Sequence, residues 1–367
     1  MALYCSYHNL TIMPHQPYML QCLQLALKGK GNTNPNPMVG AVLVHNDRVI
    51  GEGWHHYYGM PHAEVNCLDN VSVEDRHLIP ESTMYVSLEP CAHYGLTPPC
   101  ANRIVEEGIK KVVIANTDPF AKVNGRGIAI LESAGIDVVS GIMEDEGWWV
   151  NRRFFCYHTR KRPYIILKWA QTADGYVGKQ DRTSVKITGA ESQQLSHRWR
   201  TEEAAIMVGY MTALNDNPHL TARHYKGKQP LRIALDRNKN LPQSHNLFDT
   251  EAPTWIINEH DETVLGNVHF INLRFDHLIP QLLDRLQEAK ILSVIIEGGP
   301  ELQNSLIAAG MWDEARVFTG KMILGEGVAA PVLRNEIYAF SQPSGDDNLQ
   351  VYTNTNNGYA YVQGMEL

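Results

Sequence analysis

The stretch Met84-Tyr85-Val86-Ser87-Leu88-Glu89-Pro90-Cys91 decides how the first half of this chain folds. Its apolar run predicts a buried β-strand that ends at Glu89-Pro90, so that Cys91 opens the next loop or helix. Upstream, His62-Ala63-Glu64 follows a Gly-Met-Pro turn and precedes an apolar-periodic stretch, which predicts a strand-to-helix junction. Residues two apart on a regular helix point about 200° away from each other, so His62 and Glu64 can face one metal ion only at an irregular first turn.

These two segments and Cys100 carry the donor set of a catalytic zinc site. One imidazole and two thiolates, from His62, Cys91 and Cys100, match the three protein ligands that leave a fourth position for water. The pattern H-x-E followed by P-C and a later Cys is that of zinc deaminases, in which the Glu moves protons and is not a ligand. Glu64 is therefore the predicted catalytic residue. Eight residues separate Cys91 from Cys100, a longer spacing than the general signature has.

Two alternatives compete with a catalytic zinc site. A closed structural zinc site needs a fourth ligand, for which His93 or Cys67 is available. In the second alternative the cysteines are small buried hydrophobic residues without a metal. The placement of both motifs at the starts of predicted elements favours the catalytic site.

Length and composition restrict the class of protein. The 367 residues are 44% hydrophobic and 20% charged, which predicts a globular protein of two domains. The net charge of −8 does not support a broad nucleic-acid interface. Six irregularly spaced cysteines favour metal or buried-thiol roles in a reducing compartment, and we expect neither a signal peptide nor a membrane span. The sequence thus predicts a cytoplasmic protein that acts on small molecules, without nucleic-acid or membrane partners.

Helices and strands alternate along the chain, which predicts an α/β fold in each half. The first half should form three layers around one mixed sheet, whose strands are expected at 40–44, 49–53, 84–88, 111–115 and 136–139. Helices are expected at 19–27, 101–108, 127–134 and 144–155. The predicted bounds are 14–158 for this domain, 159–163 for an exposed linker, and 164–367 for the second domain.

The second half contains a continuous apolar run, 291–297, that leads into Gly298-Gly299-Pro300. Such a run predicts a strand buried on both faces, followed by a helix start whose free amides bind phosphate. No G-x-G-x-x-G follows a strand, so a Rossmann dinucleotide site is not predicted. Glu297 ends the strand, and because a buried carboxylate needs partners, we expect a polar ligand to supply them. Arg200 and Arg223 could each fork onto a phosphate or a ring carbonyl.

The assembled motifs resemble those of the bifunctional riboflavin-biosynthesis deaminase/reductase family over about 15 to 360. The segments that carry the resemblance include TNPNPMVG at 33–40, PHAE at 61–64, EPCAHYG at 89–95, TPPC at 97–100 and EGGP at 297–300. The resemblance implies a cytidine-deaminase-like three-layer α/β domain and a dihydrofolate-reductase-like α/β domain. It further implies Zn²⁺-dependent deamination of 2,5-diamino-6-ribosylamino-4(3H)-pyrimidinone 5′-phosphate, then NADPH-dependent reduction of the ribosyl to the ribityl side chain.

The resemblance also implies roles for individual residues. His62, Cys91 and Cys100 would bind zinc and Glu64 would carry the proton, while Asn36, His93 and Asp118 would contact the deaminase substrate. The reductase substrate would contact Ser184, Arg200, Leu220, Arg223 and Glu297. NADPH would contact Ala170, Lys186, Thr212, Asp216, Gly299, Pro300, Glu301, Leu302, Gln303, Asn304 and Ser305.

Three residues depart from the family pattern. Leu96 stands where Arg or Lys is usual, Lys186 where Trp is common, and Arg237 where a small hydroxylated residue is usual. These departures bear on ligand affinity and not on the reaction type. A nucleic-acid base deaminase and a non-catalytic ligand-sensing homologue stay open as alternatives; the net charge opposes the first and the complete zinc motif opposes the second. The sequence is compatible with a homo-oligomer and does not determine the oligomeric state.

Overall fold

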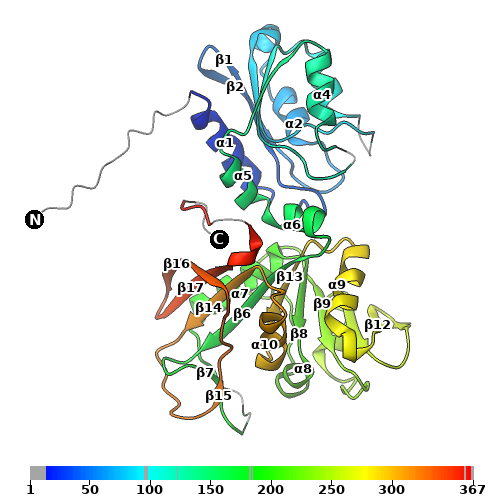
Figure 1. Cartoon of the computed structure of the whole chain (residues 1–367), viewed down its shortest axis with the longest axis vertical. Helices are drawn as coiled ribbons and strands as arrows, with labels where there is room; N and C mark the ends of the chain where they lie inside the picture. The colour runs from blue at the N-terminus through cyan, green and yellow to red at the C-terminus, as the bar shows by residue number, and fades with distance from the viewer. Residues whose placement is uncertain are drawn as a thin grey trace, which may run out of the picture. The chain divides into compact units, whose positions relative to one another are not determined.

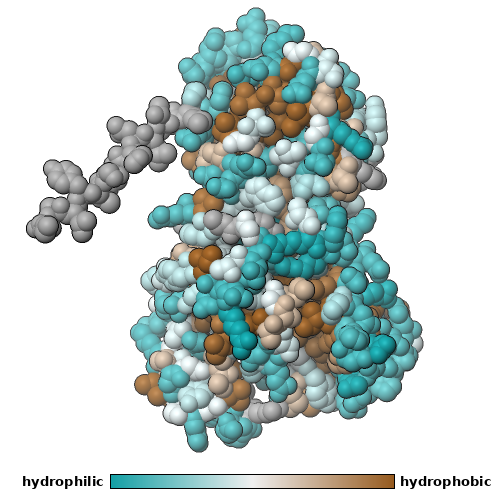
Figure 2. All heavy atoms as spheres, viewed as in Figure 1, coloured by the Kyte–Doolittle hydropathy of each residue, from teal (hydrophilic) through white to brown (hydrophobic). Residues whose placement is uncertain are grey.

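A computed structural model describes residues 14–94, 98–121, 123–181, 183, 185–358 and 361–364 (Figure 1). The chain forms two compact units, and the boundary between them falls between Val150 and Asn151. The short segment Asn34–Pro37 groups with the second unit. Within the described residues, none of the helices has the length and apolar character to cross a membrane. Figure 2 shows hydrophilic residues over much of the visible face of each unit, with smaller apolar patches between them.

The first unit is built on a mixed sheet, as predicted, with the strand order β2-β1-β3-β4-β5. Its strands are β1 (Gly40–His45), β2 (Arg48–Trp54), β3 (Thr83–Leu88), β4 (Lys111–Asn116) and β5 (Asp137–Ser140). β1 runs antiparallel to β2 and β3, with Ala41 opposite Val86, whereas β3, β4 and β5 are parallel. The helices are α1 (Gln16–Leu27), α2 (Ala63–Asp69), α3 (Cys100–Glu106), α4 (Arg126–Ser133) and α5 (Glu144–Val150), with a 3₁₀ turn at Arg76–Glu81.

The helices of this unit cover both faces of the sheet, which confirms the three predicted layers. Apolar residues of α2, α3 and α4 share one buried cluster with the strands, and α1 and α5 pack on the opposite face. Two glycines of β2 let α2 approach the sheet closely. A Cβ on Gly53 would lie 2.3 Å from the backbone nitrogen of Cys67, and one on Gly51 would lie 2.6 Å from the Cys67 carbonyl oxygen. This contact fixes the start of α2, where His62 and Glu64 lie.

The second unit contains a larger mixed sheet with the order β11-β12-β10-β9-β8-β13-β6-β14-β17-β16 within the described residues. Its strands are β6 (Tyr164–Gln171), β8 (Ala205–Val208), β9 (Leu231–Leu235), β10 (Thr254–Asn258), β11 (Thr263–Leu265), β12 (Val268–Asn272), β13 (Ser293–Glu297), β14 (Glu314–Thr319), β16 (Glu336–Ser344) and β17 (Asp347–Asn354). The strands from β12 to β14 are parallel, while β11, β16 and β17 pair antiparallel at the two ends. A separate ribbon joins β7 (Tyr176–Gly178) and β15 (Val328–Ala329).

The helices of the second unit are α6 (Arg152–Arg160), α7 (Ala190–Glu202), α8 (Tyr210–Asp216), α9 (Leu278–Glu288) and α10 (Pro300–Ala308). Short 3₁₀ turns lie at Asn246–Phe248, Phe275–His277 and Thr355–Asn357. Strand β13 confirms the prediction from the apolar run, because it pairs with β6 and β8 and is buried at every position. Its residues alternate between two apolar clusters, Val294 and Ile296 in one and Ile295 in the other, so both faces of the sheet are covered.

The predicted helix over 144–155 is wrong in its extent, because two helices, α5 and α6, meet at Asn151. Helix α6 groups with the second unit and continues into the segment predicted to be a linker. That segment is not exposed throughout, since Arg162 is buried and donates to both carboxylate oxygens of Asp313 at 2.5 and 2.9 Å. Buried carboxylates also hold Arg152 and Arg153 of α6, and these ion pairs explain why the helix joins the second unit.

Candidate active sites

The first candidate site forms where α2 begins. His62 is the N-cap of α2 with extended backbone angles (φ −75°, ψ 170°), and Glu64 lies in the first helical turn. Because His62 stands outside the regular helix, both residues can lie beside the Cys91 thiol, as the irregular first turn predicts. Glu64 is buried, with 3% of its surface exposed.

Cys91 and Cys100 complete a three-residue cluster with His62. Cys91 lies in the loop after β3, and Cys100 is the first residue of α3. The Nδ1 atom of His62 lies 3.6 Å from Sγ of Cys91 and 3.4 Å from Sγ of Cys100. Tetrahedral zinc with its usual bond lengths separates a nitrogen and a sulfur ligand by about 3.5 Å. The spacing of the cluster therefore fits a zinc ion.

The cluster has the composition of an open site. The metal-ligating group found here in the described part of the chain consists of His62, Cys91 and Cys100. Cys67 is a residue of α2 whose side chain is buried in the apolar cluster, and the ring of His93 packs edge-on against Phe120 at a centroid distance of 5.9 Å. Neither alternative fourth ligand joins the group, which favours a catalytic over a closed structural site.

The electrostatics of the cluster favour a thiolate at Cys91, whereas hydrogen bonding to Cys91 and burial raise the pKa of Cys100 well above its ordinary value. A hydrogen bond from the Cys100 thiol, together with others from His62 and the Cys100 backbone amide, lowers the pKa of Cys91 to about 4. That amide, at the start of α3, donates to Cys91 Sγ at 3.3 Å. Burial raises the pKa of Glu64 to about 7. The neighbouring His55 ring meets His62 edge-on at 5.2 Å and so supports the orientation of the imidazole.

Glu89 is a buried carboxylate that organises the loop beside the cluster. Its oxygens accept backbone N–H groups of Asp118, Gly125, Gly127 and Ile128 at 2.8 to 3.2 Å. The loop passes so close to the strand end that a Cβ on Gly127 would lie 2.0 Å from the Pro90 carbonyl oxygen. Asp118, a predicted substrate contact, is thereby fixed at its backbone, and burial raises the pKa of its own carboxyl to about 7. The sequence signal for Glu89 is a carboxylate at the end of a buried strand, where partners are obligatory.

For Asn36 and Leu96, the structure does not decide whether the side chain belongs to the first site. Asn36 falls in Asn34–Pro37, which groups with the second unit, so its predicted substrate contact stays a prediction. Leu96, one of the departures from the family pattern, lies outside the described residues.

The second candidate site is a cavity of about 1290 Å³ in the second unit, at the carboxyl ends of β6, β8 and β13. Its lining includes most of the residues predicted for the reductase: Ala170, Lys186, Arg200, Thr212, Asp216, Leu220, Glu297, Gly299, Pro300, Glu301, Leu302, Gln303 and Ser305. Asn304 and Arg223 are exposed and are not part of this lining, and Ser184 lies outside the described residues. Arg237 is also at the surface, where it pairs with Glu259 at 2.6 Å.

The turn after β13 has the geometry that the two glycines predict. Gly298 and Gly299 have φ angles of 97° and 81°, which L-residues with a side chain rarely adopt. A Cβ on Gly298 would also lie 3.0 Å from Cγ2 of Thr212 in α8. Gly299 caps α10 and Pro300 opens it, so the first amides of this helix border the cavity. Such a helix start can hold a phosphate group.

Glu297 has its partners within the protein, and the prediction that a ligand supplies them is wrong. Arg200 donates to both of its oxygens at 3.1 and 2.7 Å, and Lys168 Nζ lies 3.8 Å from Oε2. Burial raises the pKa of this carboxyl, but the charges of Arg200 and Lys168 outweigh burial and hold it at about 2. Arg200 is therefore held by Glu297, and also by the Thr221 carbonyl oxygen at 3.0 Å.

The sequence predicts no site role for Lys168, which lines the cavity beside Glu297. It lies in a strand buried on both faces, and such a strand lacks the alternation that would identify an inward-pointing polar residue. The side-chain amide of Gln303, a predicted cofactor contact, is hydrogen-bonded within the protein. It donates to the carbonyl oxygens of Lys168 and Ile296 at 2.9 and 3.1 Å and so anchors α10 to β6 and β13.

Comparison with known proteins assigns each unit to a class. Residues 13–116 match the cytidine and deoxycytidylate deaminase zinc-binding region, and residues 163–338 match the RibD C-terminal domain. Together with the three-ligand cluster and the cavity, these matches define a zinc-binding deaminase domain followed by a reductase domain of dihydrofolate-reductase-like fold, which uses a nicotinamide cofactor.

The relatives define the family. The chain is 41% identical to the riboflavin biosynthesis protein RibD of Aquifex aeolicus, over 85% of this chain and 88% of that protein. It is 33% identical to RibD of Escherichia coli strain K12, over 85% and 89%. A solved deaminase/reductase from Thermotoga maritima is 33% identical with a TM-score of 0.85, covering 93% of this chain and 98% of that one. The chain belongs to the RibD family of riboflavin biosynthesis proteins and is a bifunctional deaminase and reductase.

Proposed function

We propose that this chain catalyses two consecutive reactions on a pyrimidine ribosyl phosphate. The first unit removes the C2 amino group of 2,5-diamino-6-ribosylamino-4(3H)-pyrimidinone 5′-phosphate and releases ammonia. The second unit then reduces the ribosyl side chain to ribityl with NADPH. The observation that carries the first step is the cluster of His62, Cys91 and Cys100 beside the buried Glu64. The Thermotoga maritima relative is named for a pyrimidine deaminase and a phosphoribosylaminouracil reductase, which supports this choice of substrates.

His62, Cys91 and Cys100 would hold the zinc ion, because their donor types and spacings suit it. Zinc in such a site supplies an activated water, since it lowers the pKa of water from 15.7 to about 7. Glu64 would carry two protons in turn at its carboxylate oxygens, the first from the water to the ring nitrogen and the second from the attacking oxygen to the departing amine. The Glu89-bound loop keeps Asp118 at the edge of the site, and Asp118 and His93 would orient the pyrimidine.

In the reductase, NADPH supplies the hydride and the cavity holds both reactants. The amides at the start of α10 would bind cofactor phosphate, with Thr212 and Asp216 of α8 and Ala170 of β6 along its length. Lys186 is exposed on the rim, where its ammonium group would reach a second cofactor phosphate. The Arg200–Glu297–Lys168 group and Leu220 would position the ribosyl chain against the nicotinamide.

We propose a cytoplasmic location for this enzyme, where reduced thiols such as those of Cys91 and Cys100 persist. The decisive experiment is mass spectrometry of the pyrimidine phosphate after incubation with the zinc-loaded enzyme, with and without NADPH. We expect exchange of the amino group for oxygen in both samples, and uptake of a hydride and a proton only when NADPH is present. Reduction without prior deamination, or deamination of a tRNA and not of the pyrimidine phosphate, would reject the proposal.

A further inference from the structure

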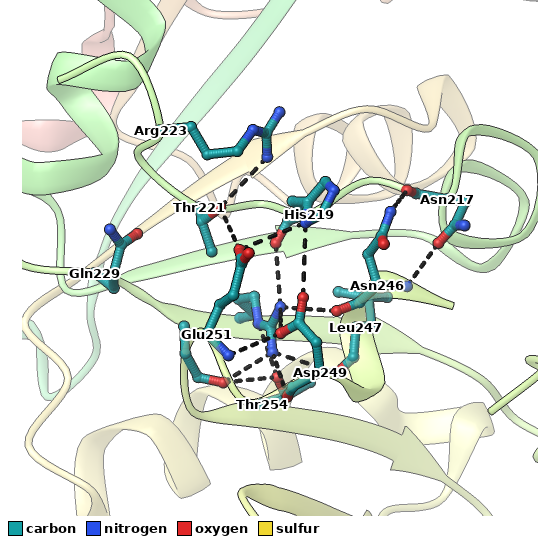
Figure 3. Close-up of polar contacts among 12 residues, drawn as sticks. Asn217, His219, Thr221, Arg223, Gln229, Asn246, Leu247, Asp249, Glu251 and Thr254 are labelled. Atoms are coloured by element: carbon teal, nitrogen blue, oxygen red, sulfur yellow. Dashed lines mark hydrogen bonds and ion pairs between the residues drawn. The ribbon is translucent and has the colours of Figure 1, made fainter. Parts of the chain in front are cut away.

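A second group of metal-ligating side chains lies in the reductase unit. His219 follows α8, while Asp249 and Glu251 follow the 3₁₀ turn at Asn246–Phe248. One ligand atom of each residue lies within 4.8 Å of the other two. The side chains keep 35%, 27% and 49% of their surface exposed, so an ion can reach the group from solvent. Figure 3 shows the three side chains converging from the two segments.

The distances in this group suit a shared cation better than a direct hydrogen bond. Nδ1 of His219 lies 3.6 Å from Oδ2 of Asp249 and 3.5 Å from Oε2 of Glu251. Within the described residues, Nδ1 has no hydrogen-bond partner, and it is itself shielded from solvent. Nitrogen and oxygen ligands of a tetrahedral zinc ion are about 3.3 Å apart. The observed spacings are slightly wider than this and clearly wider than a hydrogen bond.

Other contacts hold the three side chains in place before any ion binds. The buried Arg232 of β9 pairs with Oδ1 of Asp249 at 2.8 Å, which leaves Oδ2 to face His219. The same guanidinium donates to the carbonyl oxygens of His219 and Asp249 at 3.3 Å each, so it ties both segments to the sheet. Glu251 Oε2 accepts a hydrogen bond from Thr221 at 3.2 Å. Such outer contacts are what orient the ligands of a metal site.

We propose that His219, Asp249 and Glu251 form a second divalent-cation site, separate from the deaminase cluster. One imidazole and two carboxylates at this spacing select Zn²⁺ or a similar transition-metal ion over Mg²⁺ and Ca²⁺, which prefer all-oxygen shells. The bound ion balances the carboxylate charge that Arg232 leaves uncompensated. It also clamps the segment 217–223, which carries Leu220, a residue of the proposed substrate site that lines the cavity.

The test uses the full chain, stripped of metal by a chelator and titrated with Co²⁺, which replaces Zn²⁺ and absorbs visible light. We expect two equivalents per chain. The first has the intense charge-transfer band of a thiolate-bound ion, and the second has the weaker bands of a nitrogen–oxygen site. His219→Ala and Glu251→Gln should each weaken the second equivalent by more than about tenfold, since even the loss of an outer contact costs that much. Both variants should keep the first equivalent and deaminase activity.

His260→Ala is the matched control, because His260 is exposed and outside the cluster. This variant should bind both equivalents as the unmodified chain does. A single thiolate-type equivalent in the unmodified chain would overturn the proposal and make the group a plain ion triad. A second equivalent that survives in both His219→Ala and Glu251→Gln would overturn it as well, by placing the ion elsewhere. Loss of the thiolate band would instead count against the proposed deaminase site, so the two failures can be told apart.

Discussion

Glu64 lies in the first turn of α2, buried beside the three proposed zinc ligands, and its function depends on its acidity and not on its shape. Glu64→Gln keeps the shape and removes the proton carrier. We expect deaminase turnover to fall by about 10⁴-fold, the upper end for general acid–base groups, because one residue serves successive transfers. Ammonia release and bound zinc should be measured together, and the zinc content should stay as it is in the unmodified enzyme. Turnover within tenfold of the unmodified enzyme would remove Glu64 from the catalytic role.

The two thiolates should matter for metal content itself. Cys91→Ser and Cys100→Ser each replace a soft zinc ligand by a hydroxyl, so we expect zinc occupancy of the deaminase site to fall well below one per chain. Metal analysis after dialysis checks this, with His219→Ala present in both variants so that an ion in the reductase unit is not counted. NADPH-dependent reduction of supplied deaminated substrate should persist in Cys91→Ser and Cys100→Ser made without His219→Ala. Full zinc occupancy in either variant would show that the ligand set is wrong.

Glu297 pairs with two cations inside the reductase cavity, and Glu297→Gln leaves both without a full counter-charge. We expect loss of reductase turnover and a lower free energy of unfolding, because breaking a buried ion pair exposes its partners to an apolar environment. NADPH affinity should change little, since the amides of α10 remain. Fluorescence titration with NADPH and product formation should be measured beside Glu288→Gln, an exposed control on α9. If NADPH affinity collapses while the dependence of the rate on substrate concentration is unchanged, Glu297 belongs to the cofactor site and not to the substrate site.

At the scale of elements, the loop between β4 and α4 is held by one carboxylate. Glu89→Gln keeps the size of the side chain, but its NH₂ group cannot accept the N–H bonds that one carboxylate oxygen accepts now. The loop that carries Asp118 should therefore shift. We expect KM for the pyrimidine substrate to rise by about tenfold or more, since misplacement of a positioning group costs affinity and rate. Zinc content should be unchanged. An unaltered KM combined with lower thermal stability would mean that Glu89 has a structural role alone.

At the scale of the whole molecule, the second unit depends on buried charge pairs that acid should break. Burial alone would raise the pKa of Glu203, but attraction to Arg153 and Arg316 outweighs it and lowers the pKa to about 2, from an ordinary 4.5. Glu297 behaves in the same way, and the pKa of Glu314 also lies well below its ordinary range, although burial opposes the shift, because of Arg316 and Arg152. Since these folded pKa values are depressed, their stabilisation is complete above about pH 4.5 and is lost as the pH falls toward about 2.

Denaturant unfolding of the second unit should therefore show a steep loss of free energy between about pH 4.5 and about pH 3. Glu203→Gln should be less stable at neutral pH, yet should lose less stability over this acid range, because one of the titrating groups is gone. Intrinsic tryptophan fluorescence is a suitable probe, since Trp199 and Trp312 are buried in this unit. An equal loss of stability in both proteins would show that other groups control the acid transition.

Local sequence determined the zinc cluster, the strand β13 with the turn that follows it, and the α/β fold class. The zinc cluster could be predicted because the ligand types, their spacing and the element starts are all written in two short segments, His62-Ala63-Glu64 and Pro90 to Cys100. The strand β13 and the turn into α10 could be predicted for the same reason, since an apolar run and two glycines act on their own backbone. The strand alternation of each half sufficed for the α/β class.

Tertiary structure alone decided which distant groups meet. Arg200 is 97 positions from Glu297, Arg153 is 50 positions from Glu203, and Glu89 reaches amides up to 39 positions away. Periodicity and motif spacing report which face of an element is buried, but they do not report which charge lies opposite across the core. That pairing follows from the packing of whole elements, because a buried charge takes the partner that the fold brings within reach. For this reason the sequence located the candidate sites, and the fold decided which of their residues are already bound to one another.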